Sequence, residues 1–234
     1  MTDPVRQAVF LVGGLGTRLG ELTKVVPKPL LPVAGRPLLD HLLEKAAKAG
    51  LTDVVLLAGH ASDALDAYLK AQAPAERFGL TIAMSTEREP LGTAGAVINA
   101  LPLLAESFLL INGDTWFDFD WRALADHEAF PAVVALKAID EADRYETVAL
   151  DGERITGFHA RNTASGGGLI NGGLYRLQKS LIAEAASQPM PLSLETQLAP
   201  ALCGRGLLGG CVFDGDFIDI GVPESYAAAQ RLLA

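Results

Sequence analysis

Short apolar runs alternate with amphipathic stretches through about the first 115 residues of the chain. Apolar runs that end in glycine or a polar residue predict buried strands, and they lie at Ala8–Val12, Asp53–Ala58, Leu80–Met84 and Phe108–Asn112. Stretches with apolar residues at helical spacing predict helices at Leu38–Ala49, Ser62–Ala71 and Ala94–Leu101. This alternation is typical of a parallel sheet with helices on both faces.

The second half of the chain has shorter connections between its predicted strands. We expect strands at Ala132–Lys137, Thr147–Leu150, Arg154–Phe158, Leu169–Leu177, Leu207–Phe213 and Phe217–Ile220, of which the last two close the sheet. Helices are predicted at Ser180–Ser187, Leu194–Leu202 and Pro223–Leu233. With no Pro/Ser-rich linker and no repeat in the sequence, residues 1–234 are predicted to form a single domain. We expect a mixed, mainly parallel α/β sheet, with a more antiparallel second half.

Composition excludes several classes of protein. The 234 residues include 28 acidic and 19 basic side chains, for a formal net charge of −9, which argues against a nucleic-acid-binding protein. The N-terminus is polar and no apolar run reaches the length of a membrane span, so we expect a cytoplasmic protein. Two cysteines, Cys203 and Cys211, are too few for a disulfide framework and are expected to be reduced.

A glycine-rich loop, Gly13-Gly14-Leu15-Gly16-Thr17-Arg18, directly follows the first predicted strand. Glycines let the backbone approach a ligand closely, and the exposed N–H groups of such a loop can cradle a polyphosphate. The loop lacks the Gly-Lys-Ser/Thr of a Walker A motif and the last glycine of a dinucleotide fingerprint. A plain structural turn remains an alternative.

Lys28 stands in a segment that three prolines stiffen, Pro27, Pro29 and Pro32. We expect this segment to be extended and to hold the lysine in a loop outside the core. A rigidly held cation suits catalysis because it need not reorganise as charge develops. The alternative is a solvated surface lysine.

Two aspartates stand at the ends of apolar runs. Asp114 follows the strand Phe108–Asn112, where the ligands of open α/β sheets bind, and Asp219 lies in a strand just before a Gly-Val-Pro turn. Either carboxylate could instead cap a helix or be a satisfied core residue.

Together these motifs resemble the sugar-phosphate nucleotidyltransferases, which have a Rossmann-like fold and join a sugar 1-phosphate to a nucleoside triphosphate. The resemblance rests on the glycine-rich loop, on Pro27-Lys28-Pro29-Leu30-Leu31-Pro32-Val33 and on Gly35-Arg36-Pro37-Leu38. It implies that the triphosphate is wrapped by Val12, Gly13, Gly14, Leu15, Gly16 and Thr17. It implies that Arg18 and Lys28 neutralise the transferring phosphate, and that Asp114 and Asp219 hold Mg²⁺, a cation that prefers oxygen ligands.

The segment Glu89–Ala96 is similar to a loop that packs against the nucleobase in that family. The resemblance implies base contacts from Leu91, Gly92 and Thr93. Thr93 could also serve as the N-cap of the helix that follows, and the two roles are compatible.

Further motifs resemble one subgroup, the D-glycero-α-D-manno-heptose 1-phosphate guanylyltransferases. They are Asp143-Arg144-Tyr145, Ile155–Phe158, Gly168–Tyr175 and Gly215–Glu224. This resemblance implies GTP as donor, a heptose 1-phosphate as acceptor, and a sugar-binding half at about residues 116–234. It implies sugar-phosphate contacts from Asn112, Asn171 and Gly172, the last two of which could instead be a strand entry that needs glycine for packing.

The chain departs from the family at Ala160-Arg161, where many members have Glu-Lys. Arg161 keeps the positive charge expected to meet the sugar phosphate, whereas Ala160 cannot accept a hydrogen bond from a hydroxyl. The sequence also has no hexapeptide repeats, so we expect no C-terminal β-helix domain.

Three other functions stay open at this point. The sugar could be mannose 1-phosphate with GTP, or N-acetylmuramic acid 1-phosphate with UTP. A non-catalytic subunit that binds a nucleotide sugar is a possibility of another class, although the set Arg18, Lys28, Asp114 and Asp219 is intact. The expected oligomeric state is a monomer or a homodimer.

Overall fold

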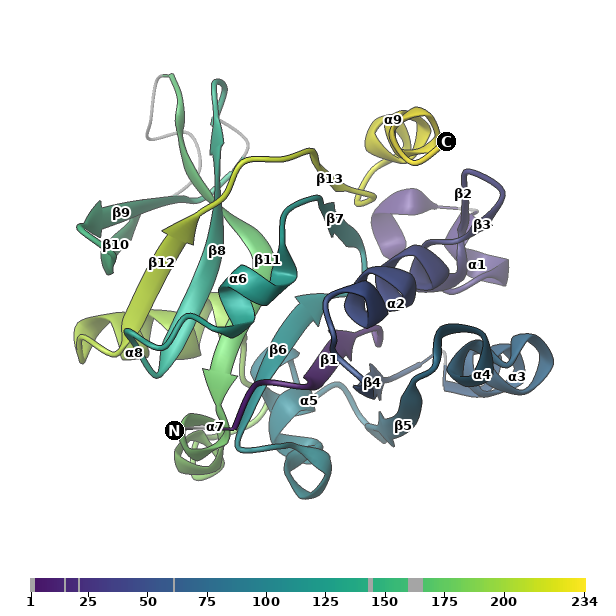
Figure 1. The fold of residues 1–234 in the computed structure, drawn as a ribbon, viewed down its shortest axis with the longest axis horizontal. Helices are drawn as coiled ribbons and strands as arrows, with labels where there is room; N and C mark the ends of the chain where they lie inside the picture. The colour runs from purple at the N-terminus through teal and green to yellow at the C-terminus, as the bar shows by residue number, and fades with distance from the viewer. Residues whose placement is uncertain (1–2, 15, 21, 61, 143–144, 160–165) are drawn as a thin grey trace.

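The computed structural model describes residues 3–14, 16–20, 22–60, 62–142, 145–159 and 166–234. Its centre is a nine-stranded sheet with the strand order β5-β4-β1-β6-β11-β8-β12-β10-β9 (Figure 1). The strands are β1 (Gln7–Leu11), β4 (Asp53–Ala58), β5 (Thr81–Thr86), β6 (Ser107–Asn112), β8 (Ala132–Ile139), β9 (Thr147–Asp151), β10 (Arg154–His159), β11 (Gly168–Gln178) and β12 (Leu208–Val212).

The predicted division into a parallel and a more antiparallel part is confirmed. Strands β5, β4, β1 and β6 pair in parallel. From β6 onward, β11 pairs antiparallel with β6 and with β8, and β10 pairs antiparallel with β12 and β9, while β12 and β8 are parallel.

Helices cover both faces of the sheet, as the alternation in the sequence predicts. They are α1 (Leu22–Val25), α2 (Leu38–Lys48), α3 (Ser62–Gln72), α4 (Pro74–Phe78), α5 (Thr93–Asn99), α6 (Trp121–Ala125), α7 (Lys179–Ala185), α8 (Ala199–Gly204) and α9 (Pro223–Leu232). Within the described residues there are also four 3₁₀ or π segments: η1 (Thr17–Leu19), η2 (Lys28–Leu30), η3 (Leu101–Leu103) and η4 (Leu194–Leu198).

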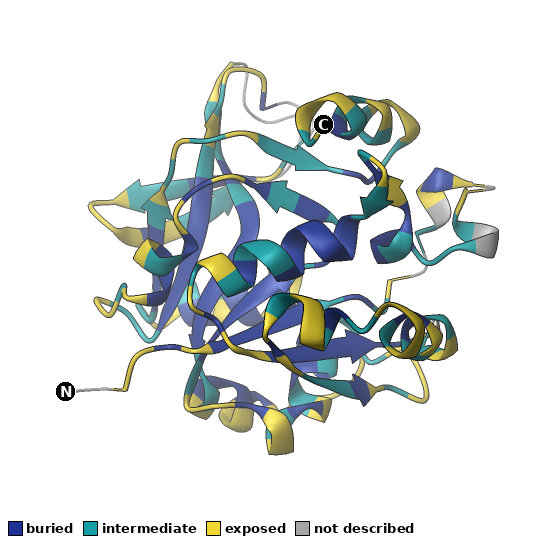
Figure 2. Cartoon of the chain, turned by 45° about the vertical axis from the view of Figure 1, so that its right-hand side comes forward, coloured by how far each residue is buried: buried dark blue, intermediate teal, exposed yellow. Residues whose placement is uncertain are grey.

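The hydrophobic core has two layers because successive strand residues point to opposite faces. In β1, Ala8 and Phe10 pack with α2 and α6 in one cluster, and Val9 packs with α5, α7 and α8 in the other. The strands at the centre of the sheet are accordingly buried along much of their length (Figure 2).

One expected strand does not join the main sheet. The segment predicted at Phe217–Ile220 forms β13 (Phe217–Asp219), which pairs antiparallel with β7 (Thr115–Phe117) in a separate two-stranded sheet. The expectation that it closes the main sheet is wrong, because the chain leaves that sheet after β12 and crosses to the residues that follow β6. This crossing brings two distant parts of the sequence together.

The proline-rich segment is also not extended throughout. Lys28–Leu30 forms the 3₁₀ turn η2, and the short hairpin β2 (Pro32–Val33) and β3 (Arg36–Pro37) follows it. The N–H groups of Leu30 and Leu31 donate to the carbonyls of Pro27 and Lys28, which closes the turn. Prolines are compatible with such a turn because their fixed φ is close to that of a helical residue.

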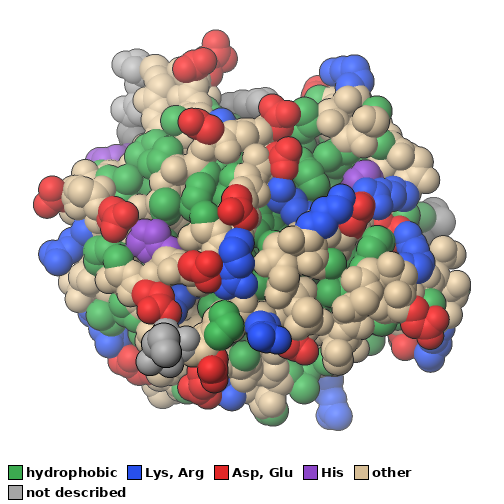
Figure 3. All heavy atoms as spheres, viewed as in Figure 1, with side chains coloured by type: hydrophobic (Ala, Val, Ile, Leu, Met, Phe, Trp, Pro, Cys, Tyr) green, Lys and Arg blue, Asp and Glu red, His purple; other side chains and the backbone are tan. Residues whose placement is uncertain are grey.

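The surface carries charges of both signs (Figure 3), and the two thiols are unpaired. Acidic and basic side chains are interspersed on the face seen in Figure 3. Cys203 and Cys211 are free and half-buried. Over the described residues, every helix is too short or too polar to cross a membrane.

Candidate active site

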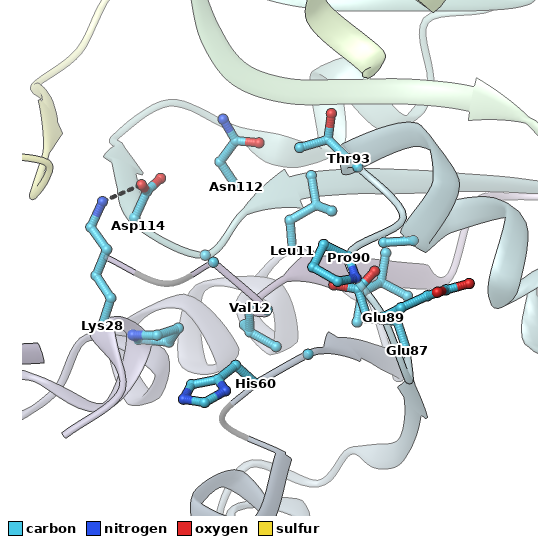
Figure 4. Close-up of a pocket in the computed structure, with 18 of the residues that line it drawn as sticks. Leu11, Val12, Lys28, His60, Glu87, Glu89, Pro90, Thr93, Asn112 and Asp114 are labelled. Atoms are coloured by element: carbon cyan, nitrogen blue, oxygen red, sulfur yellow. Dashed lines mark hydrogen bonds and ion pairs between the residues drawn. The ribbon is translucent and has the colours of Figure 1, made fainter. Parts of the chain in front are cut away.

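A cavity of about 700 Å³ opens at the carboxyl ends of the parallel strands (Figure 4). Its walls are the last residues of β1, β4 and β6, the segment 87–96 after β5, and the side chains of Lys28 and Glu195. This is the edge at which open α/β sheets bind ligands, and the volume is within the range of a small-molecule site.

The glycine-rich loop contributes Gly13 and Gly14 to the cavity wall, together with Val12. A Cβ on Gly13 would lie 2.9 Å from the nitrogen of Gly59, so this glycine permits close backbone packing. A Cβ on Gly14 would meet no atom within 4 Å. Gly14 is therefore the position at which the loop leaves open space beside the cavity.

Gly16 and Arg18, further along the loop, do not line the cavity. Gly16 has a positive φ of 63° and a Cβ there would lie 2.8 Å from the Thr23 side chain, so a structural turn explains this glycine. Leu15 and the side chain of Thr17 lie outside the part of the chain that the structure describes.

Lys28 is buried, with only 8% of its side chain exposed, and its Nζ donates to Asp114 Oδ2 at 2.5 Å (Figure 4). The expectation of a lysine in a loop outside the core is thus wrong. Asp114 directly precedes β7, and its other oxygen, Oδ1, accepts a hydrogen bond from the Thr115 hydroxyl at 3.1 Å. Both residues line the cavity.

Asp219 lies beside this pair and Arg18 lies near Asp219, although neither residue lines the cavity. The backbone N–H of Ile220 donates to the Asp114 carbonyl at 2.9 Å and Asp219 pairs with Thr115, so the two aspartates lie on adjacent segments. Asp219 Oδ1 accepts a hydrogen bond from the Gly221 N–H at 2.9 Å. A Cβ on Gly221 would lie 2.8 Å from Asp219 Oδ1 and 3.4 Å from Arg18 Nη2, so the guanidinium lies close to this carboxylate.

The donor set fits a magnesium ion that keeps water and substrate ligands. The described residues contain no group of three or more His, Cys, Asp or Glu side chains able to enclose a metal. Asp114 and Asp219 supply two hard carboxylates, and Mg²⁺ usually binds one or two carboxylates plus the phosphates of a substrate. The site therefore suits a metal that arrives with a polyphosphate.

The predicted base loop is held by a second segment of the chain. Gly92 has a φ of 80°, and a Cβ there would lie 2.5 Å from the carbonyl oxygen of Leu192. That carbonyl accepts hydrogen bonds from the N–H groups of Ala94 and Gly95 at 3.0 and 3.1 Å. It therefore accepts from the free N–H groups at the start of α5 and takes the place of a side-chain cap.

Thr93 is the first residue of α5 rather than its N-cap, which is Gly92. The expectation of a Thr93 cap is thus wrong. Its hydroxyl donates to Glu195 Oε2 at 2.7 Å and accepts from the Leu194 N–H at 2.7 Å. Gly92 and Thr93 line the cavity, and Leu91 does not; the Leu91 N–H donates to Glu87 Oε2 at 3.1 Å.

Of the predicted sugar-phosphate residues, Asn112 lines the cavity. A Cβ on Gly173 would lie 3.0 Å from Asn112 Nδ2, so β11 passes directly beside it. Asn171 lies at the irregular part of β11, where its Oδ1 accepts from the Gly173 N–H and its Nδ2 donates to the Tyr175 hydroxyl.

Asn171 and Gly172 are not among the described residues that line the cavity. A Cβ on Gly172 would lie 2.7 Å from the Phe117 ring, which accounts for a glycine there by packing alone. Ala160 and Arg161 lie outside the described residues.

The cavity is also lined by polar residues that are not among the predicted site residues: His60, Glu87, Arg88, Glu89 and Glu195. Glu87 directly follows β5, and His60 comes two residues after β4. The rule that identified Asp114, a polar residue at the carboxyl end of a parallel strand, would also have found these two. Glu195 has no such signal, because η4 reaches the cavity only through tertiary packing.

Comparison with known proteins defines the class. A sequence model of the family described as nucleotidyl transferase matches residues 7–234, so the chain belongs to the nucleotidyl transferase family. The chain is 37% identical, over 94% of its own length and 96% of the relative's, to D-glycero-alpha-D-manno-heptose 1-phosphate guanylyltransferase of Campylobacter jejuni. It is 34% identical to the protein of that name from Aneurinibacillus thermoaerophilus, with 97% and 98% covered.

Mannose-1-phosphate guanyltransferase beta-B of Xenopus laevis is 34% identical over 94% of this chain, which spans 62% of that protein. Among solved structures, HddC from Yersinia pseudotuberculosis superposes with a TM-score of 0.86 at 29% identity, covering 98% of this chain and all of that one. The same protein complexed with GMP-PN gives a TM-score of 0.84. These likenesses confirm the expected fold class and family.

Proposed function

We propose that this protein transfers GMP from GTP to D-glycero-α-D-manno-heptose 1-phosphate, giving a nucleotide-diphospho-sugar and pyrophosphate. The observation that carries the proposal is the arrangement of the Lys28–Asp114 pair on the wall of a cavity that Gly14 leaves open. A buried cation, a carboxylate and an open backbone loop at one sheet edge suit phosphate chemistry better than any other class.

In this reaction an oxygen of the sugar phosphate attacks the α-phosphorus of GTP. A new P–O bond forms there, and the bond from the α-phosphorus to the bridging oxygen of the leaving pyrophosphate breaks. The attacking phosphate is already an anion, so the protein needs to position it and offset charge rather than remove a proton. We assign charge compensation to Lys28 and Arg18, and the contact with the triphosphate to the backbone at Val12–Gly14.

Asp114 and Asp219 would hold Mg²⁺ in this scheme. The ion would supply positive charge to the phosphate oxygens. Lys28 fixes one oxygen of Asp114, and the Gly221 N–H fixes one oxygen of Asp219. Both carboxylates are thereby oriented before a substrate arrives, which suits a preorganised site.

The choice of GTP is supported by the carboxylate of Glu87 beside the base loop. Guanine presents two neighbouring donor groups, N1–H and the exocyclic amine, and a carboxylate can accept from both. Glu87 lines the cavity and is oriented by the Leu91 N–H at 3.1 Å. Uracil has only one N–H donor on the edge it presents, so Glu87 favours guanine.

The choice of a heptose is supported by the two bacterial relatives, which match this chain over nearly their whole length. Mannose 1-phosphate is the second candidate acceptor, because the Xenopus relative with that name is 34% identical to the chain. Both sugars have the manno configuration, so the same reaction serves either.

A substrate panel tests the proposal. The purified protein, with Mg²⁺, is given each of the four nucleoside triphosphates together with heptose, mannose or N-acetylmuramic acid 1-phosphate, and pyrophosphate release is measured. We expect the highest kcat/KM for GTP with the heptose. A preference for UTP with the muramic acid sugar, or no turnover with any pair, would overturn it. The Lys28→Met variant supplies the background rate.

A further inference from the structure

Glu195 is a carboxylate on the cavity wall that the expected reaction leaves without a role. It lies in η4, a single π-helical turn between the loop that holds Gly92 and helix α8. Two hydroxyls hold its Oε2 atom: Thr93 Oγ1 at 2.7 Å and Ser193 Oγ at 3.1 Å. Its side chain is thus fixed by one hydroxyl at the start of α5 and by another from the residue that precedes η4.

The other oxygen of Glu195 is available. Among the described residues, no hydrogen bond reaches Oε1. An ionised carboxylate accepts up to about four hydrogen bonds, so Glu195 retains acceptor capacity while it lines the cavity. A ligand hydroxyl is the natural donor for such an acceptor.

The surroundings of Glu195 place it toward the proposed sugar side. Burial raises the pKa of Tyr175 above its ordinary value, and the nearby negative charge of Glu195 raises it further. The hydroxyl of Tyr175 accepts a hydrogen bond from Asn171, one of the predicted sugar residues on β11. Glu195 is hydrogen-bonded to Thr93 at the start of α5, on the nucleotide side, and its neighbours Leu194 and Leu198 share a buried cluster with Tyr175 of β11, on the sugar side.

We propose that Glu195 accepts a hydrogen bond from a ring hydroxyl of the acceptor sugar and so determines which sugars are used. The inference rests on the proposed function. Ala160 cannot accept such a bond, and Glu195 supplies a carboxylate from a different part of the chain. Hydrogen bonds to a charged acceptor discriminate strongly, because a missing hydroxyl leaves the carboxylate without its partner.

The test compares Glu195→Gln and Glu195→Ala with the unmodified enzyme on mannose 1-phosphate and on analogues that each lack one ring hydroxyl. The unmodified enzyme should lose about tenfold to about 100-fold in kcat/KM on one of these analogues. In Glu195→Ala the kcat/KM for the same analogue should lie within about threefold of the kcat/KM for mannose 1-phosphate. The KM for GTP should stay nearly unchanged in both variants.

Two controls separate this role from a structural one. Ser193→Ala removes one of the hydroxyls that hold Glu195 but leaves the carboxylate, so the discrimination should persist. Glu184→Gln makes the same chemical change on an exposed residue paired with Arg205, and should change neither the kcat/KM nor the discrimination between sugars. A uniform fall in activity on all sugars, with discrimination intact, would overturn the inference.

A ribose contact is the other outcome that would overturn it. If Glu195 met the nucleotide instead, the variants would lose discrimination between GTP and its deoxy analogues and keep it between sugars. Turnover of GTP with the parent sugar by the unmodified enzyme is measured first. If that turnover is absent, the proposed function fails; if it is present and discrimination is unchanged in the variants, only the role of Glu195 fails.

Discussion

Lys28 Nζ and Asp114 Oδ2 lie 2.5 Å apart, and the lysine side chain is buried while the carboxylate is 34% exposed to the cavity. The lysine therefore does two things at once. It stabilises the fold through an ion pair between η2 and the residue that precedes β7, and it presents a fixed positive charge at the site proposed for phosphate transfer. Substitutions at Lys28 should reveal both roles.

Lys28→Ala should lower kcat by at least about 100-fold, because it removes a preorganised charge. It should also lower the free energy of unfolding by roughly 1–2 kcal/mol, since Asp114 loses its partner but keeps contact with water. Lys28→Arg should not restore activity, because the guanidinium is larger and planar. Steady-state kinetics and urea unfolding measure the two effects.

The matched control for Lys28 is Lys48→Ala, which removes an exposed lysine paired with Glu44. It should change neither turnover nor stability by a measurable amount. If Lys28→Ala kept more than about half of the kcat of the unmodified enzyme at saturating substrate, its assignment to catalysis would be wrong.

Asp219→Asn should lower kcat/KM by at least about 100-fold and raise the Mg²⁺ concentration needed for half-maximal activity. The asparagine can still accept the hydrogen bond from the Gly221 N–H, so the Tm should be unchanged. Chelation should abolish the activity of the unmodified enzyme. Asp216 is an exposed aspartate three residues earlier, so Asp216→Asn is the control and should keep the kcat/KM and the Mg²⁺ requirement of the unmodified enzyme. Near-normal activity of Asp219→Asn at low Mg²⁺ would remove Asp219 from the metal site.

Gly14→Val should raise the KM for the triphosphate at least about tenfold without lowering the Tm. The reason is that a Cβ at Gly14 meets no protein atom, whereas the position lines the cavity. Gly204, at the end of α8, offers the same open space away from the cavity, so Gly204→Val is the matched control. A normal KM in Gly14→Val would place the triphosphate elsewhere.

Gly92→Val should instead lower the Tm and affect both substrates equally. A Cβ at Gly92 would collide with the Leu192 carbonyl, so backbone packing requires a glycine here whether or not the base contacts it. Thermal unfolding of the variant measures the effect directly. A selective change in the KM for GTP, with a normal Tm, would show that Gly92 serves the base contact rather than the fold.

Glu87→Gln should raise the KM for GTP at least about tenfold and leave the KM for UTP nearly unchanged. Guanine loses a charged acceptor, whereas the glutamine still accepts from the Leu91 N–H. Glu76→Gln, on the exposed surface of α4, is the control. Equal changes for the two nucleotides would mean that Glu87 only supports the loop.

The sequence was most informative where structure is set locally. The strand at Asp53–Ala58 has the predicted bounds, because its apolar run and flanking residues lie side by side in the sequence. The role of Gly13 beside the cavity and the position of Asp114 likewise follow from the strand that precedes each of them. Burial of a strand and the loop at its carboxyl end are local consequences of the residue pattern.

The sequence was least informative where distant segments meet. Pairing of β13 with β7 joins residues about 100 positions apart, and no local pattern encodes it. The start of α5 is satisfied by the Leu192 carbonyl rather than by a Thr93 cap, which depends on where the loop before η4 packs. Glu195 reaches the cavity by that same packing, so it could be found only in three dimensions.

The central claim is that the nucleotidyl group of GTP passes to a sugar 1-phosphate. GTP radiolabelled at the α-phosphorus, or separately at the γ-phosphorus, is incubated with the enzyme, Mg²⁺ and D-glycero-α-D-manno-heptose 1-phosphate, and the products are separated. We expect the α-label in a GDP-sugar and the γ-label in pyrophosphate, in equal amounts. Transfer of the γ-label to the sugar, or no labelled sugar product, would contradict the account.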